Sequence, residues 1–370
     1  MRSGPLVCRN PRSTPPRCHR PDGQAPLAHT GKGVRPMIER KTFETARHRT
    51  AYLEAGPADG PLMIFVHGWP EAPFVWIRQI EYFSEQGWRC IAPWMRGYGA
   101  SSVPSDVAAY SNRETVADLV ELHDSLGGAP AVWIGHDWGS PVVWALAAHY
   151  PERCRGVASA SIPYIARGFA LPSLVPLVDR DIYPVDTFPV GQWDYWLAFR
   201  EHFTPVARAM EMDPAGILRL VFQPSPSLPE KRGPAFSATS RQRGGLFGGV
   251  ELAHIPGDNL LLDGAYVEEM AHDFAANGFS GPIAWYLNDD ANIEYAREAV
   301  DFARLSMPIL FVHGGRDEVC ETVHSQLAEP MREDCSDLTE VVIDAGHQLA
   351  LEDPKGTNRA IAEWLAERNL

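Results

Sequence analysis

The feature that most constrains the fold is an alternation, from residue 62 onward, of short apolar runs with longer amphipathic segments. Runs such as LMIFV (62–66) and AVWIG (131–135) have the length of buried strands. Between them, apolar side chains of the segment 111–127 recur at helical spacing. Because strands that alternate with helices form parallel sheets covered on both faces, the pattern predicts an α/β fold with a mostly parallel sheet.

The alternation stops after residue 163 and resumes only near residue 307. The intervening stretch is aromatic, punctuated by prolines and free of β-branched strand runs, which favours helices and long loops. We therefore expect a core made of residues 37–163 and 301–370. Residues 164–300 are expected to form a helical cap, or lid, inserted between the sixth and seventh parallel-region strands.

The first 36 residues differ from the rest of the chain. They hold seven prolines and seven basic residues against the single Asp22, and they show almost no apolar periodicity. This composition predicts a disordered N-terminal extension, residues 1–36, without the apolar region of a secretory signal. Either Met37 is the natural start or the segment is an unstructured tail.

Charge and cysteine content narrow the classes of partner. The 33 basic and 47 acidic residues give a formal charge of −14, which repels nucleic acids and anionic membrane surfaces. No apolar run reaches the roughly 18 residues of a membrane span. The six cysteines have neither C-x-x-C pairs nor zinc-like spacing. We expect a soluble, cytoplasmic protein with no metal, no cofactor, no nucleic acid and no stable membrane association, and a homodimer remains open.

The chemistry begins in the stretch GHDWG (135–139), which joins an apolar run to a helix-like segment. Glycines two residues before and after a central position suit the tight strand-to-helix turn written G-x-S-x-G, but the central residue here is Asp137. A carboxylate is ionised at neutral pH and can attack a saturated carbon directly, forming an ester. We interpret Asp137 as the nucleophile.

Two later residues complete a catalytic set. Asp317 follows the run PILFV and His347 follows EVVID, so that a nucleophile, an acid and a late histidine occur in the chain order of α/β-hydrolases. His347 would activate the water that hydrolyses the ester, and Asp317 would orient the imidazole. Asp344 competes with Asp317 for the acid role but lies inside its apolar run. The remaining strand-end histidines are interpreted as turn or packing residues: His67, His136 and His313.

Ester hydrolysis places an oxyanion on the Asp137 side chain, and we expect the backbone N–H groups of Trp69 and Trp138 to stabilise it. The requirements of the first step, formation of the ester, depend on the leaving group. A halide leaves as a stable anion, whereas an opened epoxide leaves as a strongly basic alkoxide that needs a proton donor. Tyrosines of the inserted segment could supply that proton.

Over residues 40–370 the chain resembles the epoxide hydrolases of the α/β-hydrolase fold. The motifs that carry the resemblance, in chain order, are HGWPE (67–71), RGYGAS (96–101), GHDWGS (135–140), GGRDEV (314–319) and AGHQLALEDP (345–354). The resemblance implies that two lid tyrosines, Tyr195 and Tyr286, hydrogen-bond the epoxide oxygen. Four other tyrosines share the insertion: Tyr164, Tyr183, Tyr266 and Tyr295. Trp94 departs from the family pattern, which commonly has an acidic residue there.

The predicted function is therefore hydrolysis of a small lipophilic epoxide by water to a vicinal diol. An aromatic-walled pocket is expected from Trp69, Trp138, Trp193, Trp196 and Phe199. A haloalkane or haloacid dehalogenase with the same aspartate nucleophile is the alternative. The residues at positions 69 and 138 depart from the patterns usual in dehalogenases. A ligand-binding member of the fold without catalysis is the third interpretation.

Overall fold

The computed structural model describes residues 17–18, 37–227 and 232–370. Apart from the two-residue strand β1, the N-terminal segment that we expected to be a disordered extension lies outside the described residues. Within the described ranges, no helix is both long and apolar enough to cross a membrane.

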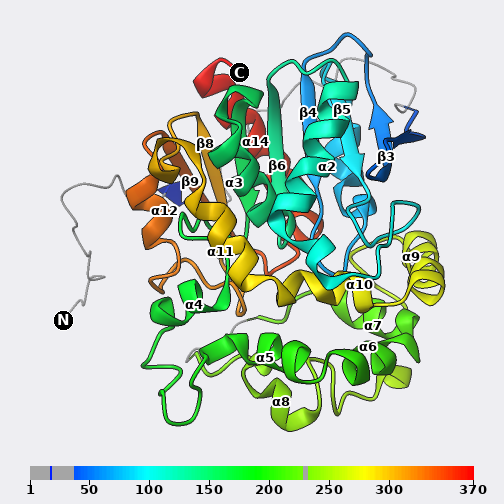
Figure 1. The fold of residues 1–370 in the computed structure, drawn as a ribbon, viewed down its shortest axis with the longest axis vertical. Helices are drawn as coiled ribbons and strands as arrows, with labels where there is room; N and C mark the ends of the chain where they lie inside the picture. Colours follow the sequence, from blue (N-terminus) through cyan, green and yellow to red (C-terminus); the bar gives the residue numbers. More distant parts are fainter. Residues whose placement is uncertain (1–16, 19–36, 228–231) are drawn as a thin grey trace, which may run out of the picture.

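One sheet organises the described chain, and its strand order is β1-β9-β8-β7-β6-β4-β5-β3-β2 (Figure 1). The strands are β1 (Arg17–Cys18), β2 (Glu39–Glu44), β3 (Arg49–Ala55), β4 (Leu62–Val66), β5 (Arg89–Pro93), β6 (Ala131–His136), β7 (Cys154–Ala160), β8 (Ile309–Gly314) and β9 (Leu338–Ile343). β2 pairs antiparallel with β3, and β3 pairs antiparallel with β5. All other pairs are parallel, which confirms the predicted α/β fold with a mostly parallel sheet.

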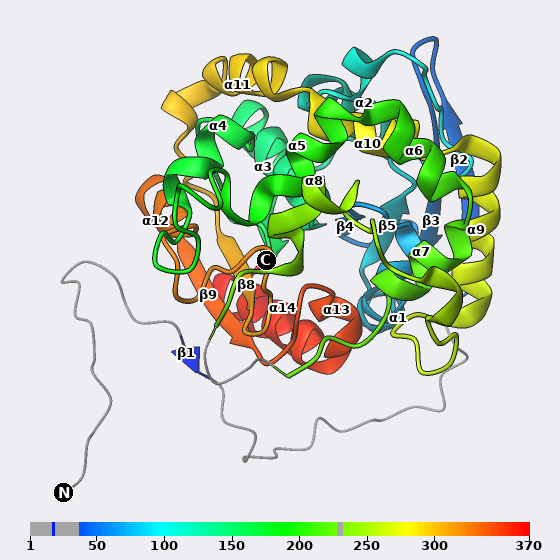
Figure 2. The ribbon, with the colours of Figure 1, turned by 90° about the horizontal axis from the view of Figure 1, so that it is seen from below.

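Helices cover both faces of this sheet, as the alternating pattern predicts. The core helices are α1 (Ile77–Ser84), α2 (Asn112–Ser125), α3 (Gly139–His149), α12 (Glu329–Asp334), α13 (Leu349–Glu352) and α14 (Pro354–Arg368). α3 packs on β6 and β7 with α2 beside it, whereas α14 packs on β8 and β9 and contacts α1. Figure 2 shows these two groups on opposite sides of the sheet. Every residue of β4, β6 and β8 is buried between them, so the apolar core runs along the centre of the sheet.

The described chain between β7 and β8 contains helices and turns but no strand. Its α-helices are α4 (Leu171–Leu174), α5 (Asp194–Glu201), α6 (Phe203–Glu211), α7 (Pro214–Val221), α8 (Ser240–Arg243), α9 (Gly264–Asn277), α10 (Ser280–Ala284) and α11 (Asp289–Arg297). Figure 1 shows α4 to α8 gathered at one end of the sheet. β7 and β8 are the sixth and seventh strands only when the antiparallel β2 and β3 are counted and the two-residue β1 is left out. The sequence patterns had identified neither β2 nor β3.

Candidate active site

The turn between β6 and α3 presents Asp137 in a backbone conformation that few side chains adopt. Asp137 has a φ of 46°, in the left-handed region, directly after the last residue of β6. A Cβ added to Gly139 would lie 2.2 Å from the carbonyl oxygen of Val66, and one added to Gly68 would lie 2.4 Å from the Asp137 side chain. Glycine is therefore required where neighbouring strand ends approach this turn.

The structure brings together the three residues that the sequence placed at separate strand ends. The backbone N–H of Trp69 donates to Oδ1 of Asp137 at 2.6 Å. Nε2 of His347 lies 3.4 Å from Oδ2 of Asp137, and Nδ1 of His347 lies 2.8 Å from Oδ2 of Asp317. Among the residues described, only Trp69 contributes a backbone hydrogen bond to the Asp137 carboxylate, although Trp138 follows it directly.

Neighbouring charges shift the pKa values of Asp317 and His347. Burial alone would raise the pKa of Asp317, but His347 and the N–H groups of Cys320 and Val319, which donate to Oδ1 at 2.9 and 3.0 Å, lower it. Burial alone would lower the pKa of His347, but the adjacent Asp317 and Asp137 carboxylates raise it well above its usual value. The imidazole is therefore favoured as a cation between two carboxylates.

Of the two acids that the sequence left in competition, Asp317 lies beside the histidine. Asp317 is buried, and its hydrogen bond with His347 is partly buried. The side chain of Asp344 is 93% exposed, and it pairs with Nε of Arg316 at 3.0 Å. Asp344 therefore belongs to the surface.

Tyr195 of α5 and Tyr286 of the short 3-10 helix η8 (Trp285–Leu287) lie next to each other, with ring centroids 5.6 Å apart. The Tyr286 ring packs edge-on against Trp138 at 5.0 Å and against Trp69 at 5.7 Å. Burial raises the pKa of both phenols well above the usual value, so both are proton donors at neutral pH.

The other four tyrosines of the insertion have different partners. Tyr164 donates to the Ala303 carbonyl at 2.7 Å, and the Tyr183 hydroxyl accepts from the Ala235 N–H at 3.1 Å. Tyr266 stacks on Phe74, and Tyr295 stacks on His149.

The aromatic residues expected to form a pocket are all buried and lie around the two tyrosines. Ring contacts within the set join Trp69 to Phe199 at 5.5 Å, Trp138 to Trp196 at 5.4 Å, and Trp193 to Trp196 at 6.4 Å. Two further rings were missed: Phe247 stacks on Trp69, and Phe169 contacts Trp138 edge-on. No sequence pattern distinguishes these phenylalanines from others in the insertion.

Sequence reasoning also missed a buried ion pair beneath the site. Glu71 is fully buried, and its carboxylate accepts from the Gly68 N–H, the Gln348 amide and Nδ1 of His136, at 2.8, 3.0 and 2.9 Å. Nε2 of His136 donates to the His347 carbonyl at 2.7 Å. Burial opposes ionisation of Glu71, but His136 and the Gly68 N–H lower its pKa to about 2. His136, interpreted as a turn or packing residue, therefore forms a charged link between the loop that contains Glu71 and the loop that contains His347.

In the part of the chain that the structure describes, one group has the donor types and spacing of a metal site. Ligand atoms of Asp317, Cys320 and His347 all lie within 4.8 Å of one another. Asp317 and His347 already hydrogen-bond each other, and burial raises the pKa of the Cys320 thiol well above its usual value. The arrangement is thus explained without an ion. Cys90, Cys154, Cys320 and Cys335 are free and buried.

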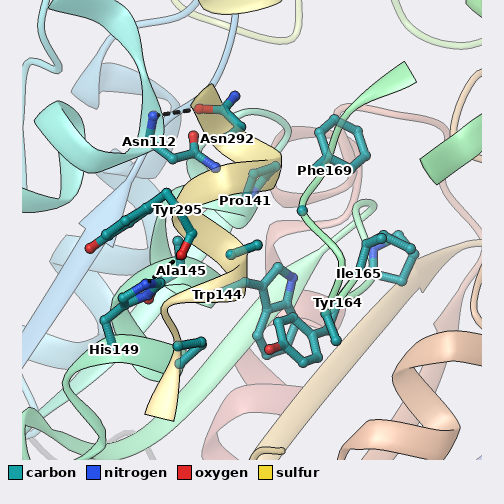
Figure 3. A pocket seen from close by; sticks show the side chains of 16 residues that line it. Asn112, Pro141, Trp144, Ala145, His149, Tyr164, Ile165, Phe169, Asn292 and Tyr295 are labelled. Carbon is teal, nitrogen blue, oxygen red and sulfur yellow. Dashed lines mark hydrogen bonds between the residues drawn. The ribbon is translucent and has the colours of Figure 1, made fainter. Parts of the chain in front are cut away.

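A separate crevice lies between α3 and α11, and Figure 3 shows the side chains that line it. The Asn112 N–H donates to Oδ1 of Asn292 across its edge at 2.8 Å. Its wall includes Phe169, which also contacts Trp138, but none of the expected catalytic residues. The crevice therefore adjoins the candidate site without being part of it.

Comparisons with known proteins place the chain in one family. A family model described as alpha/beta hydrolase fold matches residues 61–201. "Epoxide hydrolase A" of Mycobacterium tuberculosis is 32% identical over 321 residues, which are 86% of this chain and 94% of that protein. "Bifunctional epoxide hydrolase 2" of Sus scrofa is 31% identical over 320 residues, 86% of this chain, but the chain spans only 53% of that relative's length.

Solved structures give the same picture. Epoxide Hydrolase A from Mycobacterium thermoresistibile superposes with a TM-score of 0.71 at 29% identity, covering 89% of this chain and 98% of that one. An epoxide hydrolase from an endophytic Streptomyces reaches a TM-score of 0.69 at 25% identity, covering 89% of this chain and 95% of that one.

Proposed function

The chain belongs to the epoxide hydrolase family of the α/β-hydrolase fold, and from this premise we propose that it hydrolyses a lipophilic epoxide to a vicinal diol. The observation that carries the proposal is the pairing of the Asp137 carboxylate with a backbone donor on Oδ1 and an imidazole facing Oδ2. That arrangement suits attack by one oxygen while the other remains anchored.

In the first step, Oδ2 of Asp137 bonds to an epoxide carbon while the carbon–oxygen bond of the ring breaks. The departing alkoxide takes a proton from Tyr286 or Tyr195, whose buried phenols stay protonated at neutral pH. The product is a hydroxyalkyl ester of Asp137. The tyrosinate left behind regains its proton from water.

In the second step, the ester must be hydrolysed. Ester formation neutralises Asp137, so one of the two carboxylates that raise the pKa of His347 no longer does so. The imidazolium can then release its proton to solvent, and the neutral imidazole takes a proton from the water that attacks the ester carbonyl carbon. Asp317 stabilises the imidazolium that forms again. The oxyanion forms at Oδ1, where the Trp69 N–H donates at 2.6 Å. The intermediate collapses by breaking the bond between Cγ of Asp137 and Oδ2. The imidazolium returns its proton to this departing oxygen, and the diol leaves with it.

We propose that residues 164–300 act as the cap, because this segment supplies both tyrosines and Trp193, Trp196 and Phe199. Buried aromatic walls favour an apolar substrate. A panel of styrene-type, terminal aliphatic and trans-disubstituted epoxides measures this preference, and equal turnover of small polar epoxides would argue against it.

The ester route is tested by a single turnover in ¹⁸O-labelled water. The first diol formed should contain unlabelled oxygen, and mass spectrometry of the peptide that contains Asp137 should find the label. Label in the first diol would exclude the ester.

A specific observation keeps the dehalogenase alternative testable. In the described part of the structure, the indole Nε1–H groups of Trp69 and Trp193 are buried without a partner, and indole donors suit a departing halide. A bromoalkane control therefore accompanies the epoxide panel. For epoxide hydrolysis, Tyr286→Phe should lower turnover by about 100-fold, the usual size of an acid–base contribution. A dehalogenase would release bromide undiminished in this variant, and a ligand-binding protein would turn over neither substrate.

A further inference from the structure

Two side chains of one helix hold the backbone of Tyr286. Nε1–H of Trp196 and Nε–H of Arg200 both donate to the Tyr286 carbonyl oxygen, the second at 3.3 Å. Both donors come from α5, the helix that also carries Tyr195. The two phenols are therefore connected through a short path of direct contacts rather than through the rest of the cap.

Arg200 is itself anchored at a buried carboxylate. Its guanidinium forms an ion pair with Asp289, the first residue of α11, whose side chain is 7% exposed. Oδ2 of Asp289 also accepts from the Leu171 N–H at the start of α4, at 3.0 Å. A guanidinium presents several donors in a rigid planar fork, so Arg200 can hold the carbonyl and the carboxylate at the same time.

The core holds the same segment from the other side. Nε1–H of Trp285 donates to the Arg96 carbonyl at 3.3 Å. Tyr286 thus sits in a three-residue helix that is fixed to the core by the preceding residue and to α5 by its own carbonyl. Loss of the contact with α5 leaves the phenol free to shift relative to Tyr195.

We infer that Arg200 is a positioning residue that sets the Tyr286 hydroxyl relative to Tyr195, so that both phenols reach one epoxide oxygen. The inference rests on the proposed function, in which these phenols protonate the opening ring. A misplacement of about 1 Å in a reacting group costs on the order of 100-fold in rate. Because the Trp196 donor remains, we expect a smaller loss when Arg200 alone is changed.

The chain offers a matched control on the same helix. Nε of Arg241 pairs with Oδ1 of Asp194 at 2.6 Å, and its backbone N–H donates to Oδ2 at 2.8 Å. Asp194 is the first residue of α5 and is buried. Arg241→Met therefore removes an ion pair from α5 without touching Tyr286, and it reports the purely structural cost.

The experiment places Arg200→Met, Arg200→Lys and Arg241→Met in the parent protein and in Tyr286→Phe. Stopped-flow tryptophan fluorescence separates the rate of ring opening from the rate of ester hydrolysis. Arg200→Met should slow ring opening about tenfold, a part of the misplacement cost, and leave ester hydrolysis within twofold. Arg200→Lys, which keeps the charge beside Asp289, should recover part of the loss. Arg241→Met should change neither rate by more than twofold.

The Tyr286→Phe variant tests whether Arg200 acts through Tyr286. If Arg200 acts through Tyr286, Arg200→Met should cause less than a twofold further loss there, because the phenol it positions is absent. An equal tenfold loss in both backgrounds, or an equal slowing of ring opening and hydrolysis, would overturn the inference. Should Arg200→Met not fold, the partial loss of Arg200→Lys is compared in the same two backgrounds. If Tyr286→Phe alone had no effect on ring opening, the proposed function would fail first.

Discussion

Replacing Asp317 by asparagine should separate the two chemical steps. Oδ1 of Asp317 accepts two backbone N–H groups, from Val319 and Cys320, so an asparagine must keep its carbonyl oxygen at that position. Its NH₂ group then takes the place of Oδ2, 2.8 Å from Nδ1 of His347. Facing a donor, Nδ1 must be the unprotonated nitrogen, and the proton moves to Nε2.

A His347 imidazole protonated at Nε2 has no lone pair there to take a proton from water. In catalytic triads this wrong tautomer costs about 10⁴-fold in rate, or about 5 kcal/mol of activation free energy. Ring opening does not use that lone pair, so Asp317→Asn should still form the ester. We expect one equivalent of substrate to be consumed rapidly and the covalent adduct on Asp137 to accumulate.

Intact-protein mass spectrometry after mixing with excess epoxide measures the adduct, and product analysis measures turnover. Asp344→Asn is the matched control, because Asp344 is exposed and pairs only with Arg316 among the described side chains. It should turn over at the parental rate without adduct accumulation. Parental turnover by Asp317→Asn, or inactivity without an adduct, would refute the assigned division of roles.

Three further predictions follow from the same contacts. Glu71→Gln should lower the midpoint of thermal unfolding, since breaking a buried ion pair costs about 3–5 kcal/mol, and an unchanged midpoint in this variant would contradict the ion pair. Because the pKa of Glu71 lies at about 2, the stabilisation by its carboxylate in the parent protein should be lost as pH falls toward that value. The rate of ester hydrolysis should rise with pH until His347 is neutral, with a midpoint below the pKa that NMR finds for His347 in the free protein, because the ester has removed the charge of Asp137; coincident midpoints would speak against this coupling. Cd²⁺ should inhibit the enzyme by bridging Cys320 to its neighbours, and Cys320→Ser should raise the inhibitory concentration about tenfold whereas Cys335→Ser should not; equal sensitivity would exclude the thiol as a ligand.

The central strands were predictable because their signal is local. β4 and β6 are buried on both faces, so every residue in them except His136 is apolar or small, and the runs read from the sequence match their bounds within a few residues. β2 is an edge strand with the sequence ERKTFE, and most of its residues are exposed or half-buried. A charged, solvent-facing edge carries no apolar run, so β2 escaped the same reasoning.

The site likewise contains residues that local sequence could place and residues that it could not. Asp137, Asp317 and His347 each follow an apolar strand, and strand ends meet at one edge of a parallel sheet, so local sequence was enough to bring them together. Glu71 and His136 are each ordinary in their motifs. Their ion pair arises where the loop after β4 packs against the end of β6, and no spacing in the chain encodes it. The two tyrosines came from resemblance alone, because six tyrosines of the insertion look alike until their partners are known.

The charges around His347 bear on the order of the steps. In the free protein the imidazole lies between the Asp317 and Asp137 carboxylates, and these raise its pKa and favour the cationic form, which cannot act as a base. A cation here stabilises the ionised form of Asp137, which the proposed first step requires. In the proposed mechanism, esterification of Asp137 removes one anionic neighbour of this histidine, which can then release its proton to solvent and act as a base toward water. The proposed mechanism therefore activates water only after the ester has formed. This order would allow Asp137 to act as nucleophile and His347 as base although Nε2 of His347 lies 3.4 Å from Oδ2 of Asp137.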